Sequence, residues 1–415
     1  MKKISTPFFI WSCFCLSVLL TACSKPEKPE TGKEPVVVGN FPAPGLYNNE
    51  DGSPIFALVD AAKETLDVEI YEMSDADFIA AIRNAITERH VKVRIVKEPE
   101  PLGGCAVFNA PSDKEEKKCA GERSTIEELK TLGLEIVPFN KKELCGKDGD
   151  KINERYCFEH GKIVLADKKV AMVSSGNFNS SNLCNIKQNP NKCNRDYSAI
   201  TYDGDVTQTL GKIFDNDFIG KRYDLKTLLT GPVALKLTVS PYSLEPITKF
   251  IDLAEKSIKV QNQYLKELQM NDALIRAAQK PNMRVETLVS SVCSFGWPND
   301  KAKEDTALLY GKFDQAGIIS KMFTSQNLVQ GRKGYLHAKA IIIDDKFAWM
   351  GSVNGSNSAL SVNREFGLFF TDEVSVNRLK AVVDADFANN ASVTWQESLQ
   401  CKNDIDPERL RSTAR

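Results

Sequence analysis

Histidine is scarce in this chain of 415 residues, which contains only His90, His160 and His337. No two of its cysteines have the CxxC spacing that is common in zinc sites. So few candidate ligands argue against a metal centre. Any catalytic or ligand-binding role for histidine must therefore fall on these three residues.

A surplus of charge of either sign is also absent. Lys and Arg together number 54 and Asp and Glu 55, a formal net charge of −1. Without a global basic field, the chain is not suited to coating nucleic acid. Apolar residues at 42% and charged residues at 26% are typical of a globular protein, and the length predicts two or three domains.

The start of the chain has no apolar run long enough to be a convincing membrane span, which needs about 20 residues. The run Phe8–Leu20 is shorter and follows Lys2 and Lys3, a pattern that predicts a signal peptide over residues 1–22. It ends in Leu20-Thr21-Ala22-Cys23, which resembles a bacterial lipoprotein cleavage box and predicts lipidation of the cysteine. An ordinary signal peptide with a chance cysteine is the alternative.

Residues 23–45 are expected to hold the lipidated Cys23 and a flexible tether, since the segment SKPEKPETGKEP cannot bury a core. Removal of residues 1–22 would leave 52 basic and 55 acidic residues, a net charge of −3. We therefore expect an exported lipoprotein anchored to a membrane, facing the periplasm or at the cell surface. Ser24 after the cysteine, by resemblance to lipoprotein sorting, favours the outer membrane in a Gram-negative source.

Eight cysteines remain once Cys13, Cys15 and Cys23 are set aside. An even number in an exported protein predicts disulfides, although connectivity cannot be derived from sequence. Proximity along the chain suggests the pairs Cys105–Cys119, Cys145–Cys157 and Cys184–Cys193, with Cys293 and Cys401 left over.

The chain contains a tandem repeat, in which Ser53–Val96 and Glu245–Val289 have similar patterns. Each predicts the order helix, strand, helix, strand, followed by a further helix and strand. In the first copy we expect a strand at Leu66–Tyr71 and a helix at Asp75–Glu88. Ser124-x-x-Glu127 has the form of a capping box and predicts that the next helix begins there and ends at Gly133.

This repeat predicts an α/β fold of two tandem α/β/α sandwich lobes related by pseudo-twofold symmetry, with one shared active site. We expect the lobes at residues 46–230 and 231–400, followed by a C-terminal tail at 401–415. Two independent domains are the alternative, disfavoured by the short junction at Gly231-Pro232. With both halves of a site in one chain, a monomer is expected.

The same chemical pattern stands near the end of each repeat. His160-Gly161-Lys162 is followed by Asp167 and Ser175-Gly176-Asn177, and His337-Ala338-Lys339 by Asp344 and Ser352-Val353-Asn354. The spacing from His to Asp is seven residues and that from Asp to Ser is eight in both copies. Apolar residues between Lys and Asp predict a buried strand, whose alternation puts His and Lys on one face.

This paired pattern resembles the HxKxxxxD and GSxN motifs of the phospholipase D superfamily, over nearly the whole mature chain. Ser174 departs from it, because the family has glycine there, as Gly351 does in the second copy. The resemblance implies phospholipase D-like lobes that cleave phosphodiesters without metal or cofactor through a covalent phosphohistidine. It further implies His160 as the nucleophile and His337 as the general acid.

The residue types suit this chemistry. An imidazole titrates near pH 6.5, so one histidine can attack while the other donates a proton. Fixed positive charge is expected from Lys162 and Lys339. Donors to the phosphate oxygens are expected from four further side chains, Ser175, Asn177, Ser352 and Asn354.

Each histidine also needs a partner for its other ring nitrogen. The family places a carboxylate where Glu365 lies, eleven residues after Asn354. The matching segment CNRDYSAIT supplies Asp196, nineteen residues after Asn177, and the extra residues include Cys184 and Cys193. We expect the motif aspartates, Asp167 and Asp344, to brace strands rather than to take part in chemistry.

His90 begins a similar His90-Val91-Lys92, but Lys97 stands where the aspartate is required and no Ser-x-Asn follows. We interpret it as structural.

The sequence favours a phospholipase D-like hydrolase that removes phospholipid headgroups, since the anchor would hold the site beside lipid. A nuclease of the same superfamily, with extracytoplasmic nucleic acid as substrate, would want a basic groove. A phosphatidyl transferase similar to cardiolipin synthases is a further alternative, ranked lower because such synthases usually carry membrane-spanning segments. A binding scaffold with an inactive site is opposed by two complete motifs.

Overall fold

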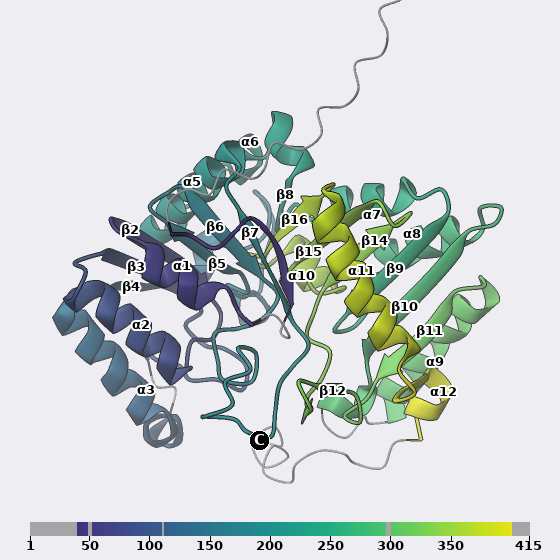
Figure 1. Ribbon diagram of the computed structural model, residues 1–415, viewed down its shortest axis with the longest axis horizontal. Coiled ribbons are helices and arrows are strands. Elements are labelled where there is room, and N and C mark those ends of the chain that lie inside the picture. Colours follow the sequence, from purple (N-terminus) through teal and green to yellow (C-terminus); the bar gives the residue numbers. More distant parts are fainter. Residues whose placement is uncertain (1–39, 49–51, 110–111, 296–299, 401–415) are drawn as a thin grey trace, which may run out of the picture. The chain divides into compact units, whose positions relative to one another are not determined.

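The computed structural model describes residues 40–48, 52–109, 112–295 and 300–400. The first lobe begins with a short strand and alternates helices with strands (Figure 1). Its elements are β1 (Gly45–Asn48), α1 (Ile55–Ala61), β2 (Thr65–Ile70), α2 (Ala76–Thr87), β3 (Lys92–Lys97), α3 (Asp113–Leu132), β4 (Glu135–Pro138), α4 (Lys141–Leu144), β5 (Lys162–Ala166), β6 (Val170–Ser174), β7 (Tyr197–Thr201), α5 (Gly204–Ile219) and α6 (Leu225–Leu228).

The second lobe repeats the main succession, with a small hairpin before the motif strand, a short helix after the next strand, and an added strand and helix at its end. Its elements are β8 (Leu237–Val239), α7 (Leu244–Asp252), β9 (Ser257–Asn262), α8 (Leu268–Ala278), β10 (Arg284–Ser290), α9 (Asp300–Gln315), β11 (Ile319–Phe323), β12 (Leu328–Val329), β13 (Arg332–Lys333), β14 (Ala340–Ile343), β15 (Phe347–Gly351), α10 (Asn357–Ser361), β16 (Phe366–Phe370), α11 (Glu373–Ala388), β17 (Ser392–Thr394) and α12 (Trp395–Ser398).

The strands form two large sheets of the same topology. The first has the order β1-β7-β6-β5-β2-β3-β4, and the second, read backwards, β8-β16-β15-β14-β9-β10-β11-β17. In each, three strands run parallel, because α2 and α3 or α8 and α9 carry the chain back between them. The predicted α/β fold of two similar lobes is confirmed, and β17 is the only strand of the second sheet without a counterpart in the first sheet, among the described residues.

The strand that follows each motif histidine is buried on both faces. In β5, Ile163 and Leu165 point into a cluster beneath α5, whereas Val164 and Ala166 point into one beneath α1 and α2. The cluster beneath α5 continues into the second lobe through Ala340 and other residues of β14 and β15. One apolar core therefore joins the two lobes, and the strands that carry both motifs pack into it.

Most local expectations hold to within a residue or two, including β2 and α2. The helix start predicted at Ser124 is wrong, because α3 begins at Asp113 and contains Ser124 in its interior. The preceding residues are mostly Lys and Glu, good helix formers that extend the helix past the apparent box. Gly133 does end it, with φ at +116°.

The three disulfides predicted from proximity are present, Cys105–Cys119, Cys145–Cys157 and Cys184–Cys193. Cys293 is disulfide-bonded as well, and Cys401 lies outside the described residues. So do the predicted signal peptide and Cys23.

The described part of the chain begins within the predicted tether of residues 23–45. Phe41, in this range, already belongs to the core of the first lobe. No helix in the described ranges is both long and apolar enough to cross a bilayer.

Candidate active site

Both motifs lie at strand ends, where the fold sets their direction. His160 stands two residues before β5 and its Lys162 is the first residue of that strand, while Lys339 directly precedes β14. Ser175 and Ser352 follow β6 and β15, the hairpin partners of those strands. Each lobe thus presents its histidine, lysine and serine from one end of two paired strands.

The carboxylates cross between the lobes. Nδ1 of His160 lies 2.9 Å from Oε2 of Glu365, which belongs to the second lobe. Nδ1 of His337 lies 2.9 Å from Oδ1 of Asp196, which belongs to the first. With Nδ1 engaged in both rings, Nε2 is the nitrogen left for chemistry. Sequence identified both carboxylates, but it could not assign them to the histidines of the opposite lobes.

The main chain crosses in the same way. The amide of His160 donates to the carbonyl of Arg364, at 2.9 Å, and the amide of Arg364 donates to Phe158, at 3.0 Å. In the other half of the site, the amide of His337 donates to the carbonyl of Arg195 at 3.0 Å. The segment just before each histidine therefore forms an isolated β-bridge with the segment that carries its carboxylate.

Two buried ion pairs anchor these crossings, and sequence reasoning missed them. Arg364 contacts Asp217 of α5 at 2.6 Å, and Arg195 contacts Asp386 of α11 at 2.9 Å. Each arginine pairs with a helix of the opposite lobe. Removal of one partner from such a buried pair typically costs about 3–5 kcal/mol. The repeated Asn-Arg-acid-aromatic pattern at 194–197 and 363–366 was the available signal.

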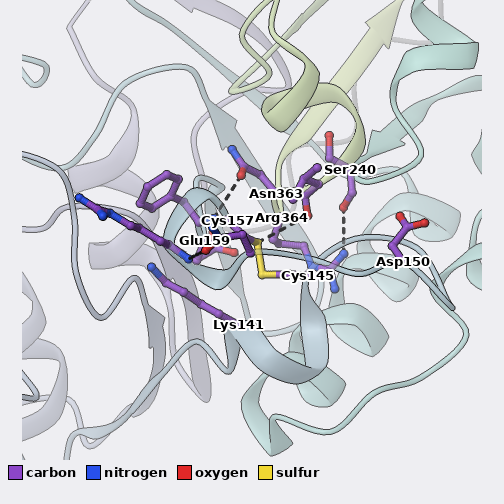
Figure 2. Close-up of a disulfide and its surroundings, with 12 residues drawn as sticks. Lys141, Cys145, Asp150, Cys157, Glu159, Ser240, Asn363 and Arg364 are labelled. Atoms are coloured by element: carbon purple, nitrogen blue, oxygen red, sulfur yellow. Dashed lines mark hydrogen bonds between the residues drawn. A yellow bond between two sulfur atoms is a disulfide. The ribbon is translucent and has the colours of Figure 1, made fainter.

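A disulfide stands beside each crossing. Figure 2 shows Cys145–Cys157 next to Glu159 and Arg364, whose guanidinium donates to Ser240. The amide of Gly146, directly after Cys145, donates to Val362 at 2.8 Å. At the other crossing, the amide of Cys193 donates to Lys333 at 2.8 Å, and Cys193 is bonded to Cys184. The disulfides therefore fix loops that the second lobe contacts.

Two asparagines orient the carboxylates, and these were also missed. The Asn182 amide donates to Oδ2 of Asp196 at 2.6 Å and lies 3.2 Å from Nδ1 of His337. Asn363 donates to Oε1 of Glu365 at 3.0 Å and accepts from the amide of Phe158. Asn182 lies two residues before Cys184, so the loop that the Cys184–Cys193 disulfide closes begins next to the site.

The motif serines do not stand as expected. The Ser175 hydroxyl donates to Asp196 at 2.7 Å and accepts from the amide of Tyr197. The Ser352 hydroxyl accepts from the amide of Phe366 at 3.1 Å. Both serines are fully buried, so their hydroxyls hold the carboxylate strands instead of facing a substrate.

The motif asparagines differ from the serines. The side-chain oxygens of Asn177 and Asn354 are buried and have no hydrogen-bond partner among the described residues. The Asn177 amide lies 3.4 Å from Glu72. These two side chains remain the better candidates for contact with a bound group, because a buried polar atom normally has a partner.

The two motif lysines are completely buried. Each ammonium donates to the main-chain carbonyl of the histidine two residues before it, from Lys162 to His160 and from Lys339 to His337. Burial lowers the pKa of Lys162 to about 8 and that of Lys339 to about 7. Glu365 and Asp196 oppose this decrease, since a carboxylate favours the charged ammonium.

Burial and nearby cations favour the neutral form of both histidines. Burial lowers the pKa of His160 to about 4 and that of His337 to about 3, and the neighbouring lysines add to the decrease. Burial alone would raise the pKa of Asp196, but His337 and Lys339 bring it below its usual value. His160 is close enough to Lys339, and His337 to Lys162, for their charges to interact, which shows that the two motifs converge.

The motif aspartates lie at the far ends of their strands. Asp167 accepts hydrogen bonds from the amides of Lys63, Glu64 and Thr65, at 2.7–3.1 Å. Asp344 makes the same contacts with residues 255–257. Both have a positive φ in a tight hairpin turn, a conformation that Asp tolerates well. Their contacts tie each motif hairpin to the neighbouring strand. Within the described residues no cluster of His, Cys, Asp and Glu could hold a metal ion.

The chain is similar in sequence to known proteins over both lobes. The family described as "Cardiolipin synthase, PLD-like domain" matches residues 55–218 and 247–388. A probable cardiolipin synthase of Bacillus subtilis, YwiE, is 24% identical over 297 residues, which cover 66% of this chain and 53% of that protein. The cardiolipin synthase of Geobacillus kaustophilus is 22% identical over 89% of this chain and 70% of its own length. The chain thus spans about half the length of the first of these relatives.

Among solved structures, the phosphatidylserine synthase of Haemophilus influenzae superposes with a TM-score of 0.57 at 13% identity, covering 88% of this chain and 91% of the other. That likeness is one of fold. The family match covers both lobes and includes both histidine motifs. The chain therefore belongs to the family of cardiolipin synthase PLD-like domains, within the phospholipase D superfamily.

Proposed function

We propose that this protein transfers a phosphatidyl group from one phospholipid to the hydroxyl of a second molecule, in a reaction of the cardiolipin synthase type. The observation that carries the proposal is the pair of histidines, each bound through Nδ1 to a carboxylate of the opposite lobe and each beside a buried lysine. The names of the relatives supply the reaction class.

In the first step, Nε2 of His160 attacks phosphorus and the bond to the leaving alcohol oxygen breaks. His337 gives its proton to that oxygen. The bound anion brings negative charge beside His337, which raises the pKa of this histidine and lets it carry the proton. Lys162 and Lys339 neutralise charge on the non-bridging oxygens. Glu365 stabilises the positive charge that forms on His160.

In the second step, the oxygen of an acceptor hydroxyl attacks phosphorus and the bond to His160 breaks. His337 takes the acceptor's proton and so returns to its starting state. Water could replace the acceptor, which would give the hydrolysis that the sequence alone favoured. We rank transfer first because the relatives are synthases.

The proposal is tested with vesicles of phosphatidylglycerol and purified protein. We expect diphosphatidylglycerol and free glycerol as products, in equal amounts, and none in the His160→Ala variant. The measurement is lipid chromatography with a labelled headgroup. Phosphatidic acid as the sole lipid product would show a hydrolase instead. Inert phospholipid together with cleaved plasmid DNA would show a nuclease.

The buried lysines make a pH prediction. Below its pKa each lysine carries the charge that binds phosphate, and because burial has lowered these values, the charge is lost as pH rises past about 7 and then about 8. The affinity for a non-hydrolysable phosphonate, whose own charge is constant in this range, should fall by up to about tenfold per pH unit for each lysine. Calorimetric titration measures it. Solvated lysines keep their charge to about pH 9 or above. An affinity that stays constant up to pH 9 would therefore contradict the prediction.

We also propose that the protein is exported and held on a membrane through Cys23, as a monomer. The disulfides of the first lobe support an oxidising compartment. Such an anchor would hold the site close to its lipid substrate.

A further inference from the structure

The second lobe contains a cavity of about 580 Å³ beside the site. This volume is within the range of about 300–1,000 Å³ that small-molecule pockets usually have. Its lining is mainly apolar and comes from the start of α8, the end of β10, α9 and β11. The apolar members are Leu265, Leu268, Val289, Leu308, Leu309 and Met322.

Two contacts join the walls of this cavity to the motif residues. The Ser290 hydroxyl, in the lining, donates at 2.8 Å to the carbonyl of Leu336, which directly precedes His337. Leu265, also in the lining, pairs with Gly355, which directly follows Asn354. The cavity therefore lies against both segments that carry the chemistry of the second lobe.

The mouth of the cavity combines apolar and basic groups. Leu268 and Leu308 are 70% and 64% exposed, although both are large apolar side chains. Lys266 and Lys312, both exposed, also line the cavity, together with one acid, Asp305, which is paired with Lys301. An apolar interior with cations at its rim is complementary to a molecule that has a hydrocarbon chain and an anionic end.

The first lobe is packed differently between the corresponding elements. Between β3 and α3, the segment at Cys105–Phe108 packs its Val107 into the core with Ile126 and Leu129 of α3. The Cys105–Cys119 disulfide holds it there, and Arg123 donates to the carbonyl of Ala106 at 3.0 Å. The two lobes therefore differ in how the residues between these elements pack, next to a site whose motifs are otherwise repeated.

We propose that this cavity binds one acyl chain of the phospholipid whose phosphate occupies the histidine site. This inference rests on the proposed function and adds to it where the lipid chain lies. The contacts of the lining with Leu336 and Gly355 put the lipid chain on the side of the second lobe, next to His337. A chain seated there places the glycerol end of the substrate beside the motif segments. The exposed leucines receive the part of the chain nearest the membrane.

The test is direct binding of a homologous series of alkyl methylphosphonates to the full protein, measured by calorimetry. In the wild type, the dissociation constant should fall by up to about threefold to fourfold for each added methylene, until the chain fills the cavity. Thr306→Trp places a ring in the cavity and should make affinity independent of chain length, while the affinity for the shortest phosphonate stays within about twofold of the wild type.

Thr125→Trp is the matched control. Thr125 and Thr306 occupy α3 and α9, and each donates its hydroxyl to the carbonyl four residues earlier. The control should keep the dependence on chain length. In a second pair, Leu268→Glu at the rim should weaken long-chain binding at least fivefold, whereas Val374→Glu, equally exposed at a helix start, should not.

The outcomes separate this inference from the proposed function. A flat chain-length series in the wild type, with diphosphatidylglycerol still produced, would overturn the cavity assignment alone. A steep series that Thr306→Trp abolishes, in a protein without transferase activity, would leave the cavity assignment in place and reject the proposed function. A steep series unchanged by both Thr306→Trp and Leu268→Glu would put the chain elsewhere.

Discussion

Replacement of either motif histidine by alanine should reduce turnover of a phosphodiester by about 10⁴-fold or more, since the two rings act as one unit. His160→Ala lacks the attacking nitrogen, and His337→Ala lacks the proton donor. The double variant should be no slower than the slower single variant by more than a few fold. Steady-state assays with phosphatidylglycerol measure all three.

The two variants should differ when the leaving group needs no proton. With a p-nitrophenyl ester of phosphatidic acid, His337→Ala should still release p-nitrophenolate in a burst and retain a phosphatidyl group on the protein. His160→Ala should do neither. Acid-labile phosphate on a peptide that contains residue 160, found by mass spectrometry, identifies the nucleophile. The opposite pattern would exchange the two roles and leave the two-histidine mechanism in place.

His90→Asn provides the control for this experiment. His90 is exposed and has a φ of +55°, a conformation that asparagine tolerates. Its replacement should leave turnover within about twofold of the wild type. Full activity in either His160→Ala or His337→Ala would remove the mechanism.

Local patterns in the sequence were sufficient for much of this site. The unbroken apolar run Ile163 to Ala166 predicts a buried strand, and the structure has an apolar cluster on each face of it. The spacing of His, Lys and Asp is repeated because both hairpins, β5–β6 and β14–β15, need the same turn. Such features depend on neighbours within one hairpin, so a sequence pattern can reveal them.

Contacts between the lobes could not be predicted in the same way. Nothing near His160 in the sequence indicates Glu365, 205 residues away. The crossing follows from packing of the two sheets on a shared core, a property of the whole chain. The prediction that the Ser175 hydroxyl binds substrate failed for the same reason. Its acceptor, Asp196, comes close to it only because β7, which follows Asp196, pairs with β6.

The crossed carboxylates make the second large prediction. Glu365→Gln and Asp196→Asn should each lower turnover of phosphatidylglycerol by about 10³- to 10⁴-fold, because an amide can hold its histidine in the wrong tautomer and cannot stabilise the imidazolium. Both substitutions keep nearly the same volume, so the fold should persist. Circular dichroism and thermal unfolding check this.

The p-nitrophenyl substrate then shows which histidine each carboxylate serves. Because Asp196 contacts His337 and Glu365 contacts His160, Asp196→Asn should behave like His337→Ala and recover its burst. Glu365→Gln should behave like His160→Ala and recover none. This correspondence does not depend on which histidine attacks. If the roles of the histidines were exchanged, each carboxylate variant would still behave like the alanine variant of the histidine that it contacts. If Glu365→Gln instead matched His337→Ala, the carboxylates would serve the histidines of their own lobes. The double variant Asp196→Asn with His337→Ala should be within a few fold of His337→Ala, because residues that act through one another are not additive.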